Sequence, residues 1–135
     1  GASAQAIFCM TDGLVYNYRG SWCAEGLNTN WEADWRFIGE KGSARWDGAA
    51  GLQAQVVVAT GGFRSELADV PVPEVDPEGK EGRHLGCIRE FVDCVRHGGT
   101  PETVAEDNIR SLAMVFGAIE SAETGRPVAI AQGGE

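Results

Sequence analysis

The spacing of the apolar residues changes once along the chain, across the proline-rich segment of residues 61–80. Before this segment apolar residues recur at every second position, as in residues 30–38, NWEADWRFI. After it they recur at intervals of three and four, as in residues 83–99, RHLGCIREFVDCVRHGG. A period of two predicts strands with one apolar face, and a period near 3.6 predicts amphipathic helices. The sequence therefore predicts strands first and helices after them.

Short turn signals separate the apolar runs of the first half. Residues 4–23 are predicted to form a hairpin around TDG, where Gly13 suits a positive φ. Further strands are predicted at residues 30–38, 43–48 and 52–60, with GEKG as a tight turn. In the first of these, Trp31, Ala33, Trp35 and Phe37 are expected to share a buried face. Short connections require antiparallel pairing.

Two amphipathic helices are predicted in the second half. The first ends at the Gly98-Gly99 pair. The second starts near Thr103, whose spacing to Glu106 is that of a capping box, and ends at Gly125. We therefore expect one α+β domain over residues 1–135, with an open-faced, mainly antiparallel sheet of about five or six strands and two C-terminal helices packed on one face. The other face is left to water, a ligand or a partner.

Charge and composition exclude several partners. The chain has 11 Lys and Arg against 20 Asp and Glu, a net charge of −9, which repels nucleic acid and anionic membranes. No apolar run approaches the roughly 20 residues that a membrane span needs. The first residues, GASAQAIF, contain no secretion signal, so we expect a cytoplasmic protein with reduced, buried thiols. A Cys9–Cys23 disulfide across the predicted hairpin stays open as an alternative.

Recognisable catalytic and cofactor motifs do not occur in the sequence. It contains no G-x-G-x-x-G turn, P-loop, nucleophile elbow or H-E-x-x-H pattern. His84 and His97 lie at opposite ends of one predicted helix, about 20 Å apart. Glu32 and Asp34 share a predicted strand face with Arg36, which favours an ion ladder over a hydrolase site. We assign no catalytic, cofactor-binding or metal-binding residue to this chain.

A polar cluster, Asn28, Thr29 and Asn30, directly precedes Trp31. Amide and hydroxyl groups beside an aromatic ring are the combination that holds sugars and polyols, because the amides bind hydroxyls while the ring covers the C–H face. An ordinary polar turn leading into a strand is the alternative interpretation.

Two long segments together resemble a known family. They are GSWCAEGLNTNWEADWRFIGEKGSARWDG and HLGCIREFVDCVRHGGTPETVAEDNIRSLAMVFGAIESAETGRPVAI, and the chain resembles the C-terminal domain of the Gfo/Idh/MocA oxidoreductases, the family of glucose-fructose oxidoreductase and inositol 2-dehydrogenase. The resemblance implies that an N-terminal Rossmann domain, absent from this sequence, binds NAD or NADP and carries the catalytic lysine. GEKG lacks the proline of that lysine motif and lies in a predicted turn.

The resemblance also implies a role for the polar cluster and for the sheet. Thr29, Asn30 and Trp31 correspond to positions that line the substrate pocket in polyol-using members. The open sheet face corresponds to an oligomer interface, so we expect a homodimer or a higher homo-oligomer. We therefore expect the substrate-binding and oligomerisation domain of an NAD(P)-dependent oxidoreductase acting on a sugar, polyol or related hydroxy compound, inactive as an isolated fragment. The alternative is a stand-alone, non-catalytic binding or assembly module.

Overall fold

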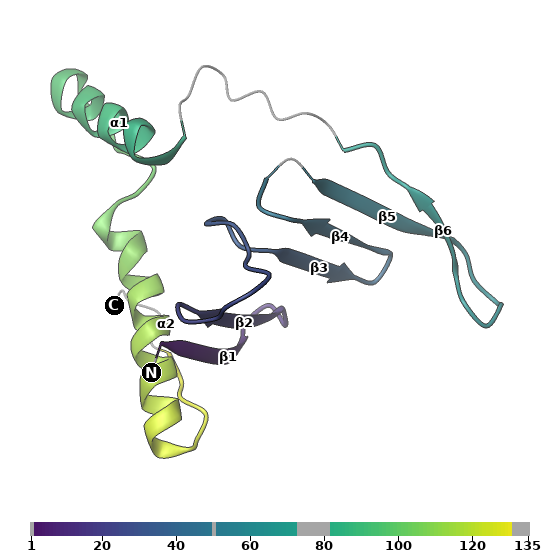
Figure 1. The fold of residues 1–135 in the computed structure, drawn as a ribbon. Helices are drawn as coiled ribbons and strands as arrows, with labels where there is room; N and C mark the ends of the chain where they lie inside the picture. The colour runs from purple at the N-terminus through teal and green to yellow at the C-terminus, as the bar shows by residue number, and fades with distance from the viewer. Residues whose placement is uncertain (1, 50, 73–81, 131–135) are drawn as a thin grey trace. The chain divides into compact units, whose positions relative to one another are not determined.

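The order of secondary structure follows the change in apolar spacing. The structure, a computed structural model, describes residues 2–49, 51–72 and 82–130. Within these residues six strands precede two helices (Figure 1). The elements are β1 (Ser3–Cys9), β2 (Val15–Ser21), β3 (Trp35–Gly39), β4 (Gly42–Trp46), β5 (Leu52–Ala59), β6 (Glu66–Asp69), α1 (Arg83–His97) and α2 (Ala105–Thr124). This content confirms the predicted α+β class.

The chain divides into two compact units, Gly1–Asp76 and Pro77–Glu135. The first unit contains the strands and the second contains both helices. The boundary lies inside the proline-rich segment, where the sequence changes its apolar period. A single domain over residues 1–135, with the helices packed on one face of the sheet, stays a prediction.

The strands of the first unit form two antiparallel sheets, β1-β2 and β3-β4-β5-β6. The predicted hairpin of β1 and β2 is confirmed, with Ser3 opposite Ser21 and Cys9 opposite Val15. Gly13 has a φ of 87° in its turn, as its sequence position predicts. Residues 22–34 separate β2 from β3, and so long a connection does not constrain the two strands to pair as a tight turn would.

The strand predicted at residues 30–38 begins later than the alternation suggests. β3 starts at Trp35, because Ala33 has a φ of 67°, which is incompatible with an extended strand. The oxygen Oδ1 of Asn30 also accepts a 2.8 Å hydrogen bond from the backbone N–H of Glu32, which bends the chain into a turn. Trp31 therefore lies outside the strand row in which the sequence places it.

The register of the larger sheet separates an apolar face from a mixed one. Trp35 lies opposite Trp46, Phe37 opposite Ala44, and Ala44 opposite Ala54. Because side chains alternate along a strand, these residues share the apolar face with Leu52, Val56 and Ala68. The mixed face carries residues between them in the strands, which are Arg36, Ile38, Ser43, Arg45, Gln53, Gln55, Val57, Leu67 and Asp69.

Glycine ends both helices where the sequence predicts it. The N–H of Gly98 bonds to the carbonyl of Cys94, and Gly125, with a left-handed φ of 67°, bonds to Ser121. The predicted capping box at Thr103 is wrong. α2 begins after Val104 without a side-chain cap, and the Val104 carbonyl accepts the backbone N–H groups of Asp107 and Asn108.

Burial differs from the sequence prediction. Of the residues that the structure describes, no hydrophobic side chain is buried, and Trp31, Trp35 and Phe37 are 82%, 36% and 52% exposed. The cysteines are exposed as well, apart from the half-buried Cys94. An apolar strand face is covered only when a second layer packs on it, so alternation identifies the apolar face without establishing that it is covered.

Candidate functional site

Four stacked rings cross the first unit, and we call them the aromatic row. Phe8 stacks on Tyr16, Tyr16 on Trp35 and Trp35 on Phe37, with centroid separations of 5.9, 6.1 and 6.2 Å. The interplanar angles are 16°, 13° and 7°. The Tyr16–Trp35 contact joins β2 of the small sheet to β3 of the large one.

The two remaining aromatic rings in contact form a different arrangement, the tryptophan corner. Trp22 and Trp31 lie near the two ends of the connection between β2 and β3, with ring centroids 5.6 Å apart and planes at 72°. Their side chains are 81% and 82% exposed. The corner therefore presents two nearly perpendicular indole surfaces to solvent.

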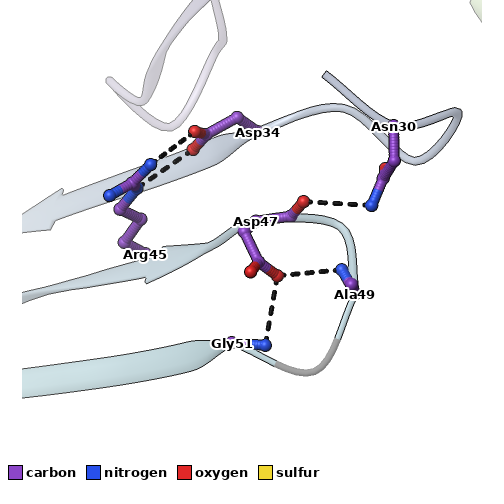
Figure 2. Close-up of polar contacts among 6 residues, drawn as sticks. All are labelled: Asn30, Asp34, Arg45, Asp47, Ala49 and Gly51. Carbon is purple, nitrogen blue, oxygen red and sulfur yellow. Dashed lines mark hydrogen bonds and ion pairs between the residues drawn. The ribbon is translucent and has the colours of Figure 1, made fainter. Parts of the chain in front are cut away.

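Asn30 fixes the backbone directly beside the corner. Its Nδ2 donates a 3.1 Å hydrogen bond to the backbone carbonyl of Asp47 (Figure 2). Its Oδ1 accepts the backbone N–H of Glu32. Its own carbonyl accepts the N–H of Ala33 at 3.2 Å. The side-chain amide thus joins the turn before β3 to the loop after β4 and retains one N–H and one lone pair.

The loop that receives Asn30 is closed by Asp47. Its Oδ1 accepts the backbone N–H groups of Ala49 at 2.9 Å and Gly51 at 3.1 Å (Figure 2). These two donors, Ala49 first, lower the pKa of the Asp47 carboxyl. The indole N–H of Trp46 donates to the carbonyl of Ala49 at 2.9 Å. The loop is therefore held by its own polar groups.

Gly48 lies where the loop contacts the turn. It is buried and has a φ of 77°. A Cβ at this position would collide with Oδ1 of Asn30 and with the carbonyl oxygen of Ala33. Only glycine satisfies both the backbone conformation and the available space.

The carboxylate of Asp34 pairs with Arg45 on the neighbouring strand. The distances are 2.7 Å from Nη2 to Oδ2 and 3.3 Å from Nε to Oδ1 (Figure 2). These hydrogen bonds are the main reason that the pKa of Asp34 is lowered. The predicted ladder of Glu32, Asp34 and Arg36 is wrong, because β3 begins only after Asp34. An acid held ionised by a guanidinium is a poor general base, which weighs against the hydrolase alternative.

The cysteines and histidines are not gathered into a site. Cys9 ends β1 beside the hairpin turn, whereas Cys23 follows Ser21 at the open end, and both thiols are free. Hydroxyl groups of Ser21 and Ser3, at 3.5 and 3.7 Å from Sγ, lower the pKa of Cys23. His84 and His97 lie at opposite ends of α1.

Neither a cluster of metal ligands nor a membrane-spanning helix occurs in the described part of the chain. There, no three His, Cys, Asp or Glu side chains come together as metal ligands. Neither of its helices combines the length and apolarity required to cross a bilayer.

The sequence-predicted binding residues lie together in one exposed stretch. Thr29, Asn30 and Trp31 all belong to the connection before β3. Sequence reasoning missed Trp22 and the Asp47 loop as their neighbours. An Asp-Gly pair at residues 47–48 signals a turn, but nothing in the linear sequence indicates that Asn30 would bond to it.

Comparison with known proteins gives one family. The profile described as the C-terminal alpha/beta domain of an oxidoreductase family, Gfo/Idh/MocA, matches residues 11–130. The comparisons with curated proteins and with solved structures give no significant match.

Proposed function

Because the chain belongs to the Gfo/Idh/MocA oxidoreductase family as a C-terminal alpha/beta domain, we propose that it binds the substrate and mediates oligomerisation in an NAD(P)-dependent oxidoreductase. The substrate class is a sugar, a polyol or a related hydroxy compound. The family match over residues 11–130 carries the proposal, and the exposed polar and aromatic stretch before β3 supports the choice of substrate.

Thr29, Asn30 and Trp31 are the proposed substrate-binding residues. The indole of Trp31 is exposed and offers a flat apolar surface. The amide of Asn30 is held in place by Asp47 and Glu32 while keeping one donor and one acceptor position. A preorganised amide beside an aromatic surface suits a ligand with hydroxyl groups and C–H faces.

The described residues do not fit a dinucleotide cofactor. Its pyrophosphate requires a glycine-rich turn that leads from a strand into a helix, whereas α2 follows another helix and the sequence contains no G-x-G-x-x-G. We therefore assign NAD or NADP to an N-terminal Rossmann domain of the full-length protein.

The mixed face of the β3–β6 sheet is the proposed homo-oligomer interface. Ile38 and Leu67 on this face are 77% and 52% exposed, among Arg36, Ser43 and Gln55. Apolar side chains interspersed with polar ones are typical of interfaces between subunits.

An assay of hydride transfer tests the proposal. Full-length protein is expected to change NAD(P)H absorbance at 340 nm with at least one sugar or polyol, and the 135-residue chain alone is expected to be inactive. Full-length protein that binds a polyol without hydride transfer would support the stand-alone binding module instead. Turnover by the isolated chain would contradict the proposal.

A further inference from the structure

We propose that Trp22 is a second wall of the substrate site, and that its corner with Trp31 selects ring-shaped polyhydroxy compounds over open-chain polyols. This inference rests on the proposed function, because it requires the stretch of Thr29, Asn30 and Trp31 to meet the substrate. It adds a specificity-determining residue, Trp22, to the three proposed binding residues.

The angle between the two indole rings suits a cyclic ligand. The two indoles form an edge-to-face pair, with planes at 72° and centroids 5.6 Å apart, and both are more than four-fifths exposed. A sugar or cyclitol ring has a flat patch of C–H groups on its face and hydroxyls around its edge. With its face on one indole, its edge meets the other. An open chain has no such rigid face and loses more conformational freedom on binding.

The indole N–H groups separate the corner from the other tryptophans. Trp35 donates its N–H to the carbonyl of Glu32 at 2.8 Å, and Trp46 donates to Ala49. Across the described ranges, the N–H groups of Trp22 and Trp31 have no such partner within the chain. The corner therefore combines two apolar surfaces with two donors available to ligand hydroxyls.

Asn30 positions the corner and supplies its amide. Asn30 precedes Trp31 directly, and its bonds to Asp47 and Glu32 hold the backbone from which the Trp31 indole projects. Apolar surface rimmed by polar groups marks binding sites on folded proteins. The ordered amide lowers the entropic cost of capturing a rigid ring.

Calorimetric titration of the full-length protein tests the inference. D-glucose and myo-inositol serve as ring probes and D-sorbitol as the open-chain probe. Wild-type protein is expected to bind at least one ring probe about tenfold more tightly than sorbitol, and Trp22→Ala should lose about tenfold on that ring and twofold or less on sorbitol. Trp22→Phe should retain most of the preference. Phe63→Ala removes a fully exposed ring outside the corner and should change nothing.

The outcomes separate this inference from the proposed function. If wild-type protein prefers a ring probe and Trp22→Ala binds it equally well, the inference fails and the proposed function stands. If Trp22→Ala loses affinity equally for the ring probe and for sorbitol, Trp22 is a structural residue and the inference is overturned. The inference is also overturned if wild-type protein shows no preference for a ring probe. If wild-type protein binds none of the probes, the proposed substrate class and the inference fall together.

Discussion

The side-chain amide of Asn30 donates a 3.1 Å hydrogen bond to the backbone carbonyl of Asp47. Through this bond the turn before β3 and the loop after β4 support each other, although 17 positions separate the two residues. The proposed binding stretch is therefore anchored to the sheet.

Substitutions at the binding stretch should affect substrate affinity in the full-length enzyme. Trp31→Ala removes the proposed stacking surface and Asn30→Ala removes the amide, so each is expected to raise KM by about tenfold. Glu32→Gln keeps the backbone N–H that Asn30 binds and is expected to change KM by less than about twofold. Steady-state kinetics provides the measurement, and equal effects at all three positions would leave the stretch as a turn.

Gly48→Ala should destabilise the first unit strongly. Alanine at this position would have an unfavourable φ of 77°, and its Cβ would collide with Asn30 and Ala33. The expected cost is about 2 kcal/mol or more in the free energy of unfolding. Gly13→Ala is the matched control, because Gly13 has a φ of 87° but open space around it, which predicts a cost of about 1 kcal/mol. Urea unfolding measures both, and equal costs would show that the Gly48 contact is unimportant.

Ala33→Gly should stabilise the protein. Ala33 has a φ of 67°, and relieving this conformation is expected to outweigh the added freedom of the unfolded chain by about 0.5–1 kcal/mol. Ala44→Gly in the extended strand β4 should have the opposite sign. A lower unfolding midpoint for Ala33→Gly would contradict the left-handed turn before β3.

The Asp47 loop should lose stability in acid. Hydrogen bonds from Ala49 and Gly51 lower the pKa of Asp47 in the folded state, with a smaller effect from the charge of Arg45. The stability from this carboxylate is therefore fully present above the unfolded pKa of about 3.9 and is lost as pH falls through the folded pKa. Asp34, held by Arg45, acts in the same direction. Asp47→Asn should weaken the pH dependence of the urea unfolding midpoint between about pH 5 and pH 2. An unchanged pH dependence would show that other acidic groups cause the loss of stability.

Substitution of Ile38 by lysine should weaken self-association of the full-length protein. Ile38→Lys places a charge in the mixed face of the sheet and is expected to shift full-length protein towards monomer in light scattering. Leu14→Lys, at a comparably exposed apolar position in the β1–β2 turn, is the control and should leave the mass unchanged. Loss of association in both variants would indicate a general effect of charge.

The features that sequence reasoning predicts are those specified by neighbouring residues. GEKG marks the short turn between β3 and β4. Gly13 marks the other predicted turn, and Gly98 and Gly125 end the helices, because these three positions have a positive φ that glycine adopts readily. The start of β3 was not predictable, because alanine gives no signal of a positive φ at residue 33.

The site was predictable only in part for a related reason. The run from Thr29 to Trp31 is visible in the sequence, whereas the approach of Trp22 and the bond from Asn30 to Asp47 depend on how the connection folds back. Likewise, Asp34 selects Arg45 across the sheet over Arg36 nearby in sequence, because pairing of β3 with β4 brings the two together.

In the described residues every strand pairs only with strands next to it in sequence. Each pairing therefore requires closure of a short loop, which takes well under a millisecond in polypeptides. Low contact order of this kind favours rapid folding. The hairpins of the first unit are thus able to form during synthesis, before the helical residues emerge from the ribosome.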